Sequence, residues 1–168
     1  QFQELTATEK SSLGAEIIGD GSFESGTDSW GTTDATITTS HTDITAQSGS
    51  KSLRITSGNE SYDNAYKTFA VLDGQLYKVE LYLYKASDSD GTFVWRVGTS
   101  ADDSSVTGNI QINTFGSWVK STRYFVGGGT TPLYLSVVPS NTTTSTDVAY
   151  VDNVSVKAVT HDLVSYWA

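Results

Sequence analysis

Residues 75–84 read QLYKVELYLY, and this stretch decides the fold class. Every second residue is apolar or aromatic, which gives the set Tyr77, Val79, Leu81 and Leu83. The residues between them form a second set, Lys78, Glu80, Tyr82 and Tyr84. Successive side chains of a β-strand point to opposite faces of the sheet. The stretch therefore predicts a strand with its first set in a core and its second set on an outer face.

Two later stretches repeat this alternation. In 92–98 one side carries Phe93, Trp95 and Val97, and the other side carries Val94 and Arg96. In 132–138 one side carries Leu133, Leu135 and Val137, and the other carries Tyr134 and Ser136. Three strands with one apolar face each are typical of two packed sheets. The sequence predicts an antiparallel two-sheet sandwich in which one sheet has an outer surface enriched in tyrosine.

Short runs bounded by Gly, Asn, Asp and Ser recur along the chain, as in other all-β proteins. They predict nine or ten strands, of which the clearest are 35–39, 52–56, 66–71, 75–84, 92–98, 109–113, 118–126, 132–138 and 149–157. No segment has a convincing apolar period of 3.6 residues, so little helix is expected. The polar residues 1–13 have a weak helical tendency and are interpreted as a leader or linker. The sandwich is expected over 14–159, with a C-terminal extension over 160–168.

Charge and composition exclude several classes of function. The 168 residues carry a formal net charge of -9, which argues against nucleic acid and against an anionic membrane surface as partners. No run approaches the roughly 18 apolar residues of a membrane-spanning helix, so membrane insertion is not expected. The chain has no cysteine, which rules out disulfides and thiolate metal sites.

Five short motifs resemble the jelly-roll carbohydrate-binding modules of the family 4/9/22 group. In order, they are DGSFESG at 20–26 with Trp30, SGSKSL at 48–53, DGQLY at 73–77, GSW at 116–118 with Phe125, and VDNVSV at 151–156. The resemblance covers roughly residues 15–158 and implies a jelly-roll sandwich. It also places Trp30 and Trp118 at scaffold positions, where we expect them in the core.

The same resemblance implies a structural calcium ion. Its ligands would be the side chain of Glu24, the backbone carbonyl of Lys51 and the side chain of Asp152. Calcium prefers six to eight oxygen ligands from carboxylates and carbonyls, which suits this set. The alternative is that Glu24 and Asp152 cap turns or pair with Lys51 or Arg54.

A glycan site is predicted from strand alternation. Tyr82, Tyr84 and Tyr134 are expected in one solvent-facing row, with Glu80 and Arg96 nearby. Aromatic rings stack on the apolar faces of sugars, and polar side chains bind sugar hydroxyls. The alternative is that these tyrosines make ordinary cross-strand pairs.

Trp95 and one loop cluster are further candidates for ligand contact. Trp95 shares its side with Phe93 and Val97, so a core position is favoured. A one-residue bulge would turn its ring into a ligand-binding groove on the outer face, so Trp95 stays a candidate for ligand binding. The loop cluster Tyr62, Asp63, Asn64 and Tyr66 is interpreted as a solvated turn, with ligand binding as the alternative.

The leading hypothesis is a non-catalytic glycan-binding module of a larger extracellular protein, bound to a polysaccharide or a cell-surface glycan. His41 and His161 lie in unrelated loops, and no catalytic motif is present, so an enzyme is not expected. The alternative is a structural or adhesive virion protein or a subunit of a bacterial surface appendage. In that case the terminal segments of the chain would contact other copies in a homo-oligomer, or neighbouring subunits. The residues in contact would be Phe2, Leu163, Tyr166 and Trp167.

Overall fold

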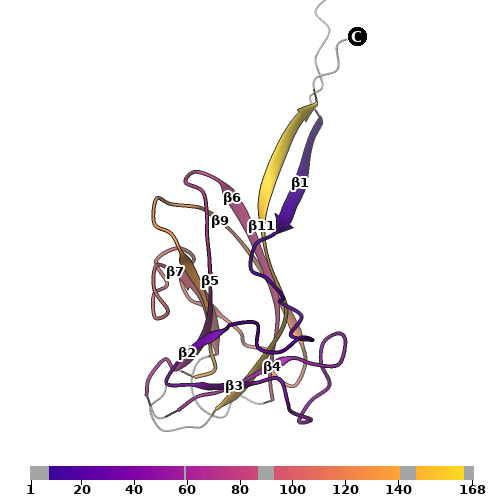
Figure 1. Ribbon diagram of the computed structural model, residues 1–168, viewed down its shortest axis with the longest axis vertical. Coiled ribbons are helices and arrows are strands. Elements are labelled where there is room, and N and C mark those ends of the chain that lie inside the picture. The colour runs from indigo at the N-terminus through magenta and orange to yellow at the C-terminus, as the bar shows by residue number, and fades with distance from the viewer. Residues whose placement is uncertain (1–7, 59, 87–92, 141–146, 165–168) are drawn as a thin grey trace, which may run out of the picture.

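The computed structural model describes residues 8–58, 60–86, 93–140 and 147–164, and within these ranges it contains eleven strands and no helix. Two sheets form the layers of a sandwich (Figure 1). All strand pairs are antiparallel, which confirms the predicted all-β sandwich. The nine predicted runs correspond to nine of these strands.

The first layer is a six-stranded sheet in the order β3-β4-β11-β6-β9, with β1 paired to β11. Its strands are β1 (Thr8–Glu16), β3 (Thr36–Thr38), β4 (Leu53–Thr56), β6 (Leu76–Lys85), β9 (Val119–Val126) and β11 (Val148–Val164). The second layer is a five-stranded sheet in the order β2-β5-β10-β7-β8. Its strands are β2 (Gly31–Thr33), β5 (Asn64–Phe69), β7 (Val94–Gly98), β8 (Ile110–Gln111) and β10 (Leu133–Val138).

The core lies between the sheets and follows the predicted alternation. The inward residues of β6 are at most 4% exposed, whereas its outward residues are half-buried. Both sheets contribute large, fully buried side chains, including Phe93, Trp95, Leu81 and Leu135. Burying side chains of this size contributes about 1.5–3 kcal/mol each, so this interface is the main source of stability.

A two-stranded ribbon extends from one end of the sandwich (Figure 1). It is formed by β1 and the last part of β11, with Thr8 opposite Val164 and Leu13 opposite Val159. These strands run across both expected boundaries, at 13/14 and 159/160, and β1 replaces the weak helical tendency expected there. The residues of β1 are mostly polar, so no apolar alternation indicates a strand, and the backbone pairing with β11 supplies the hydrogen bonds.

The part of the chain that the structure describes contains no helix that is long and apolar enough to cross a membrane.

Candidate functional site

The residues of the predicted tyrosine row lie on opposite faces of the molecule. Glu80, Tyr82 and Tyr84 point outward from β6 in the six-stranded sheet. Arg96 on β7 and Tyr134 on β10 point outward from the five-stranded sheet. Because the core separates the two layers, the prediction of a single row is wrong. Alternation assigns a side chain to a face of its own strand, but it does not say which sheet the strand joins.

Trp95 is a core residue, and its placement among the ligand-binding candidates is wrong. The side chain is fully buried, and its Nε1 donates a hydrogen bond to Ser121 Oγ at 2.9 Å. The register between β7 and β10 runs without a shift, so no bulge turns the ring outward. The hydrogen bond satisfies the polar atom of the indole, which is what permits its burial.

Trp30 and Trp118, both predicted to lie in the core, differ in position. Trp30 is 6% exposed and packs in the core at 5.6 Å from the ring of Phe23, as expected. Trp118 is half-buried and lies outside the core cluster, so its predicted core position is wrong. Its Nε1 donates a hydrogen bond to the carbonyl of Thr45 at 3.0 Å. Through this hydrogen bond, Trp118 holds the β3–β4 loop against the outer face of the six-stranded sheet.

Neighbouring side chains occupy the outer face of the six-stranded sheet. The ring of Tyr84 lies 5.6 Å from that of Trp118 and 5.8 Å from that of Tyr150. The ammonium of Lys120 lies 5.7 Å from the ring centroid of Tyr82 and 2.7 Å from Glu80 Oε1. Burial alone would raise the pKa of Glu80, but hydrogen bonds from Lys120 and Lys78 outweigh it and lower the pKa. The predicted residues on this face therefore make contacts within the protein.

The five-stranded sheet carries a tyrosine pair on its outer face. Tyr66 of β5 and Tyr134 of β10 are half-buried, and their ring centroids are 5.5 Å apart. The ring of Tyr66 covers Gly31 of β2, where a Cβ would lie 2.6 Å from the Cζ of that ring. Glycine at this position therefore allows the ring to lie close to the sheet. The pair presents adjacent aromatic surface next to solvent.

Polar side chains adjoin this pair. Asn64 donates a hydrogen bond from Nδ2 to Asp102 Oδ1 at 2.7 Å. Arg96 is 4% exposed and lies 3.8 Å from Asp102 Oδ1, too far for a hydrogen bond. Within the described residues, its Nε and Nη2 have no hydrogen-bond partner. Burial lowers the pKa of the Arg96 guanidinium, and the charge of Asp102 partly opposes this shift.

Tyr62 lies over this buried cation. Its ring centroid is 5.5 Å from Arg96 Cζ, and its side chain is 42% exposed. The φ angle of Tyr62 is 66°, a region that non-glycine residues rarely adopt. Tyr62 and Tyr66 thus join Arg96 and Tyr134 on one face, which the interpretation of residues 62–66 as a solvated turn missed. The signal in the sequence was the density of aromatic and polar residues in this segment.

The three predicted calcium ligands come from segments that meet at the β3–β4 loop. Glu24 Oε1 accepts hydrogen bonds from the backbone amides of Ser50 and Lys51, both at 2.8 Å. Asp152 Oδ2 accepts hydrogen bonds from the amides of Gln47 and Ser48 at 3.0 and 3.2 Å. The two carboxylates therefore bind turns of one loop, as the alternative interpretation predicts. Lys51 also donates from Nζ to the Glu24 carbonyl at 2.8 Å, whereas Arg54 pairs elsewhere.

The two carboxyl groups have opposite pKa shifts. The Ser50 hydroxyl and the loop amides lower the pKa of the exposed Glu24 carboxyl. Burial raises the pKa of Asp152, hydrogen bonds from the loop amides oppose the shift, and the charge of Glu24 adds to it. A cation between them would relieve this penalty, and carboxylate and carbonyl oxygens suit calcium. Among the described residues, no group of three or more His, Cys, Asp or Glu side chains is placed to hold a metal.

Comparisons with known proteins identify the class. A family model described as "Carbohydrate binding domain" matches residues 15–144, more than half of the chain. The chain therefore belongs to this carbohydrate-binding family, in agreement with the resemblance seen in its sequence motifs. A search of curated proteins gave no match.

Solved structures share the fold at low sequence identity. A family 16 carbohydrate-binding module is 16% identical, with a TM-score of 0.61, and the match covers 83% of this chain and 98% of that one. The CBM22-1 xylan-binding domain of Paenibacillus barcinonensis Xyn10C is 15% identical, with a TM-score of 0.59 and coverage of 93% and 97%. Tailspike protein 4 of bacteriophage CBA120 is 16% identical, with a TM-score of 0.58 and coverage of 85% and 21%. The chain thus has the fold of a carbohydrate-binding module.

Proposed function

We propose that this domain binds a glycan without catalysis, through the outer face of the five-stranded sheet. The observation that supports this most directly is the Tyr66–Tyr134 pair, with ring centroids 5.5 Å apart. Sugar rings stack their C–H faces on such aromatic surface. The neighbouring Asp102 carboxylate, whose side chain is 61% exposed, offers an acceptor for sugar hydroxyls, and the buried Asn64 donates to it.

Removing either tyrosine tests this assignment. Tyr66→Ala and Tyr134→Ala are each expected to weaken binding about tenfold, because each removes one stacking surface. Binding is measured first on an array of xylo-, gluco-, manno- and galacto-oligosaccharides, and then by calorimetry with the best ligand. Tyr82→Ala is the matched control, because this ring lies on the opposite sheet. Loss of binding in Tyr82→Ala, with Tyr66→Ala and Tyr134→Ala unchanged, would contradict the assignment.

We propose an extracellular setting, in which the domain holds a larger protein against a polysaccharide or a cell-surface glycan. Membership of the carbohydrate-binding family supports this role. The alternative is a virion or surface-appendage subunit; a phage tailspike shares the fold, and this likeness concerns the fold alone. Its proposed contacts at Phe2, Leu163, Tyr166 and Trp167 lie outside the residues whose side chains the structure describes. A chain that binds no glycan on the array and self-associates in solution would favour this alternative.

We also propose that calcium binds Glu24, the Lys51 carbonyl and Asp152 as a structural ion. The binding of Glu24 and Asp152 to the same loop, which contains Lys51, supports it, together with the raised pKa of the buried Asp152 carboxyl. The ion would supply positive charge between the carboxylates and so hold the loop. It has no proposed role in catalysis.

Chelation is the test of the ion. At calcium one hundred times above its dissociation constant, linkage adds about 2.7 kcal/mol to the free energy of unfolding. Adding EDTA to the calcium-loaded protein is therefore expected to lower the melting temperature by about 5–10 °C. Asp152→Asn keeps the size of the side chain, and its melting temperature is expected to be insensitive to EDTA. Equal melting of the native chain with calcium and with EDTA would count against the ion.

A further inference from the structure

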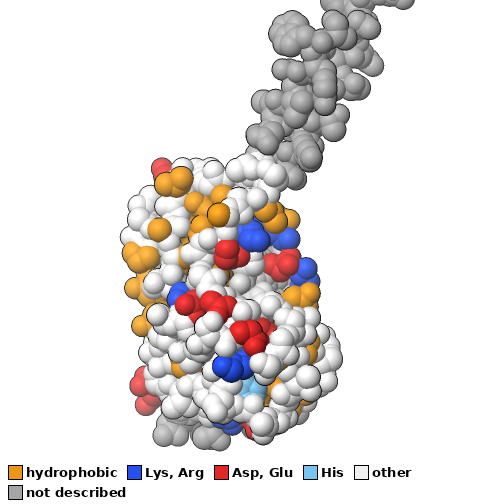
Figure 2. Space-filling model, turned by 45° about the vertical axis from the view of Figure 1, so that its right-hand side comes forward, with side chains coloured by type: hydrophobic (Ala, Val, Ile, Leu, Met, Phe, Trp, Pro, Cys, Tyr) orange, Lys and Arg blue, Asp and Glu red, His pale blue; other side chains and the backbone are white. Residues whose placement is uncertain are grey.

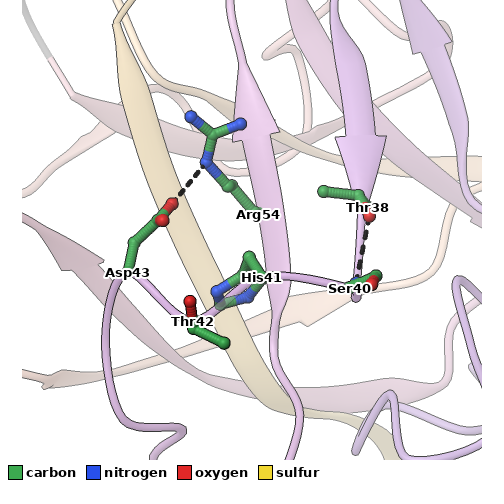
Figure 3. Close-up of a pocket in the computed structure, with 6 residues that line it drawn as sticks. All are labelled: Thr38, Ser40, His41, Thr42, Asp43 and Arg54. Carbon is green, nitrogen blue, oxygen red and sulfur yellow. Dashed lines mark hydrogen bonds and ion pairs between the residues drawn. The ribbon is translucent and has the colours of Figure 1, made fainter.

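A polar pocket lies on the other layer of the sandwich, at the β3 edge of the six-stranded sheet. It has a volume of about 390 Å³ and is lined by Thr38, Ser40, His41, Thr42, Asp43 and Arg54. Figure 3 shows these side chains arranged between the end of β3, the loop that follows it, and β4. A pocket of this volume lies within the range of small-ligand sites in proteins. None of these residues belongs to the tyrosine face described above.

The charges in this pocket balance each other. Arg54 Nε lies 2.9 Å from Asp43 Oδ2, and the two side chains are 30% and 49% exposed. Arg54 also donates from Nη1 to Thr56 Oγ1 at 2.9 Å. A paired cation and anion leave no excess charge to attract an ion of either sign. The hydroxyls of Thr38, Ser40 and Thr42 add further polar groups, so the lining suits an uncharged ligand with many hydroxyls.

The carboxylate of Asp43 is held in place by a residue of the neighbouring sheet strand β11. Tyr150 of β11 is 5% exposed and donates its hydroxyl to Asp43 Oδ2 at 3.0 Å. The ring of His41 packs on that of Tyr150, with centroids 5.1 Å apart. Figure 2 shows acidic and basic side chains gathered on one face of the molecule, next to a pale-blue histidine. Fixing a carboxylate before the ligand arrives lowers the entropy cost of binding.

His41 carries an unfilled acceptor. Its Nε2 lies 3.0 Å from the carbonyl of Ser52, which can only accept, so Nε2 carries the proton in the neutral ring. Nδ1 is then an acceptor, and within the described residues it has no hydrogen-bond partner. Because the atom is buried, it does not reach a ligand in this pocket. The groups of the pocket that can bind the vicinal hydroxyls of a sugar are therefore the Asp43 carboxylate, the Arg54 guanidinium and the hydroxyls of the lining.

We propose that this pocket is a second sugar-binding site, which takes one unit of a neutral glycan whose hydroxyls donate to Asp43 and accept from Arg54. The inference rests on the proposed function, because it assigns a second contact to the same class of ligand. The two sites lie on different sheets and so on opposite sides of the core. One molecule can therefore hold two glycan chains, and on a polysaccharide network that engages both sites the combined affinity exceeds that of either site alone.

The test separates the two sites by substitution in the full chain. Tyr66→Ala/Tyr134→Ala removes the first site, and this variant is expected to retain residual binding on the same neutral oligosaccharide array. Adding Arg54→Ala is expected to reduce that residual binding at least tenfold. Ser40→Trp is the second test variant, because it fills the pocket from an exposed position and leaves the Arg54–Asp43 pair in place. It is expected to have the same effect as Arg54→Ala, with an unchanged melting temperature.

The outcomes distinguish the two proposals. If the native chain binds nothing on the array, the proposed glycan function fails. If the native chain binds but Tyr66→Ala/Tyr134→Ala retains nothing, only the second site is overturned. Residual binding that is unaffected by both Arg54→Ala and Ser40→Trp also overturns it. With both sites intact, the native chain is expected to precipitate the soluble polysaccharide built from its array ligand, and Ser40→Trp is expected to bind that polysaccharide without precipitating it.

Discussion

Trp95→Ala is expected to lower the free energy of unfolding by about 3–5 kcal/mol. The indole is fully buried between the sheets, so its removal leaves a cavity that the surrounding strands fill only in part. The substitution also leaves Ser121 Oγ without the Nε1 donor at 2.9 Å. Urea unfolding followed by far-ultraviolet circular dichroism measures the change, since the midpoint reports stability when the slope is unchanged.

Two variants separate the causes of this effect. Trp95→Phe keeps an aromatic ring and loses the hydrogen bond, so it is expected to cost less than alanine. Tyr124→Ala removes a large side chain that is 59% exposed, and it is expected to change the stability by no more than about 0.5 kcal/mol. Similar unfolding midpoints for Trp95→Ala and Tyr124→Ala would show that the Trp95 ring does not occupy the core.

Lys85→Ala is expected to destabilise the protein by about 3–5 kcal/mol, because it leaves a buried carboxylate without its partner. Lys85 Nζ lies 2.9 Å from Asp147 Oδ2, and the two side chains are only 3% and 8% exposed. The ammonium also donates to the carbonyl of Pro139 at 2.9 Å. Asp147→Ala is expected to cost a similar amount, since it leaves the cation buried instead. Thermal and urea unfolding of both variants measure the loss.

The double variant Lys85→Met/Asp147→Leu shows whether charge or packing is responsible. Replacing both partners by apolar side chains removes the desolvation penalty, so this variant is expected to be more stable than either single variant. Lys120→Ala is the surface control, because Lys120 pairs with Glu80 where solvent screens the interaction, and only a small change is expected. A Lys85→Ala protein as stable as Lys120→Ala would contradict the buried pair.

Local alternation predicted much of this fold. The apolar set of residues 75–84 is buried in β6, and the polar and tyrosine set points outward, because the pleat of a strand enforces a period of two. The same rule placed Leu133, Leu135 and Val137 in the core. Strand β1 gave no such signal, because a mostly polar ribbon is defined by its backbone pairing with β11.

The candidate site was predicted less well, because strand alternation carries no information on sheet membership. Tyr82 and Tyr134 both point outward, as expected, but they are on different sheets. Their actual neighbours, Lys120 for Tyr82 and Tyr66 for Tyr134, come from other strands. Only the strand order brings Tyr66 beside Tyr134.

By itself, the sequence determined that this protein is an all-β sandwich, which side chains of each long strand are buried, and, through its motifs, the carbohydrate-binding family. The tertiary structure decided which tyrosines share a surface, which loop Trp118 binds, and that Arg54 meets Asp43 and His41 in a pocket. The physical reason is the distance along the chain between the residues that interact. Burial on a strand follows from a repeat of two residues, whereas a binding surface requires pairing between strands that lie far apart in the chain.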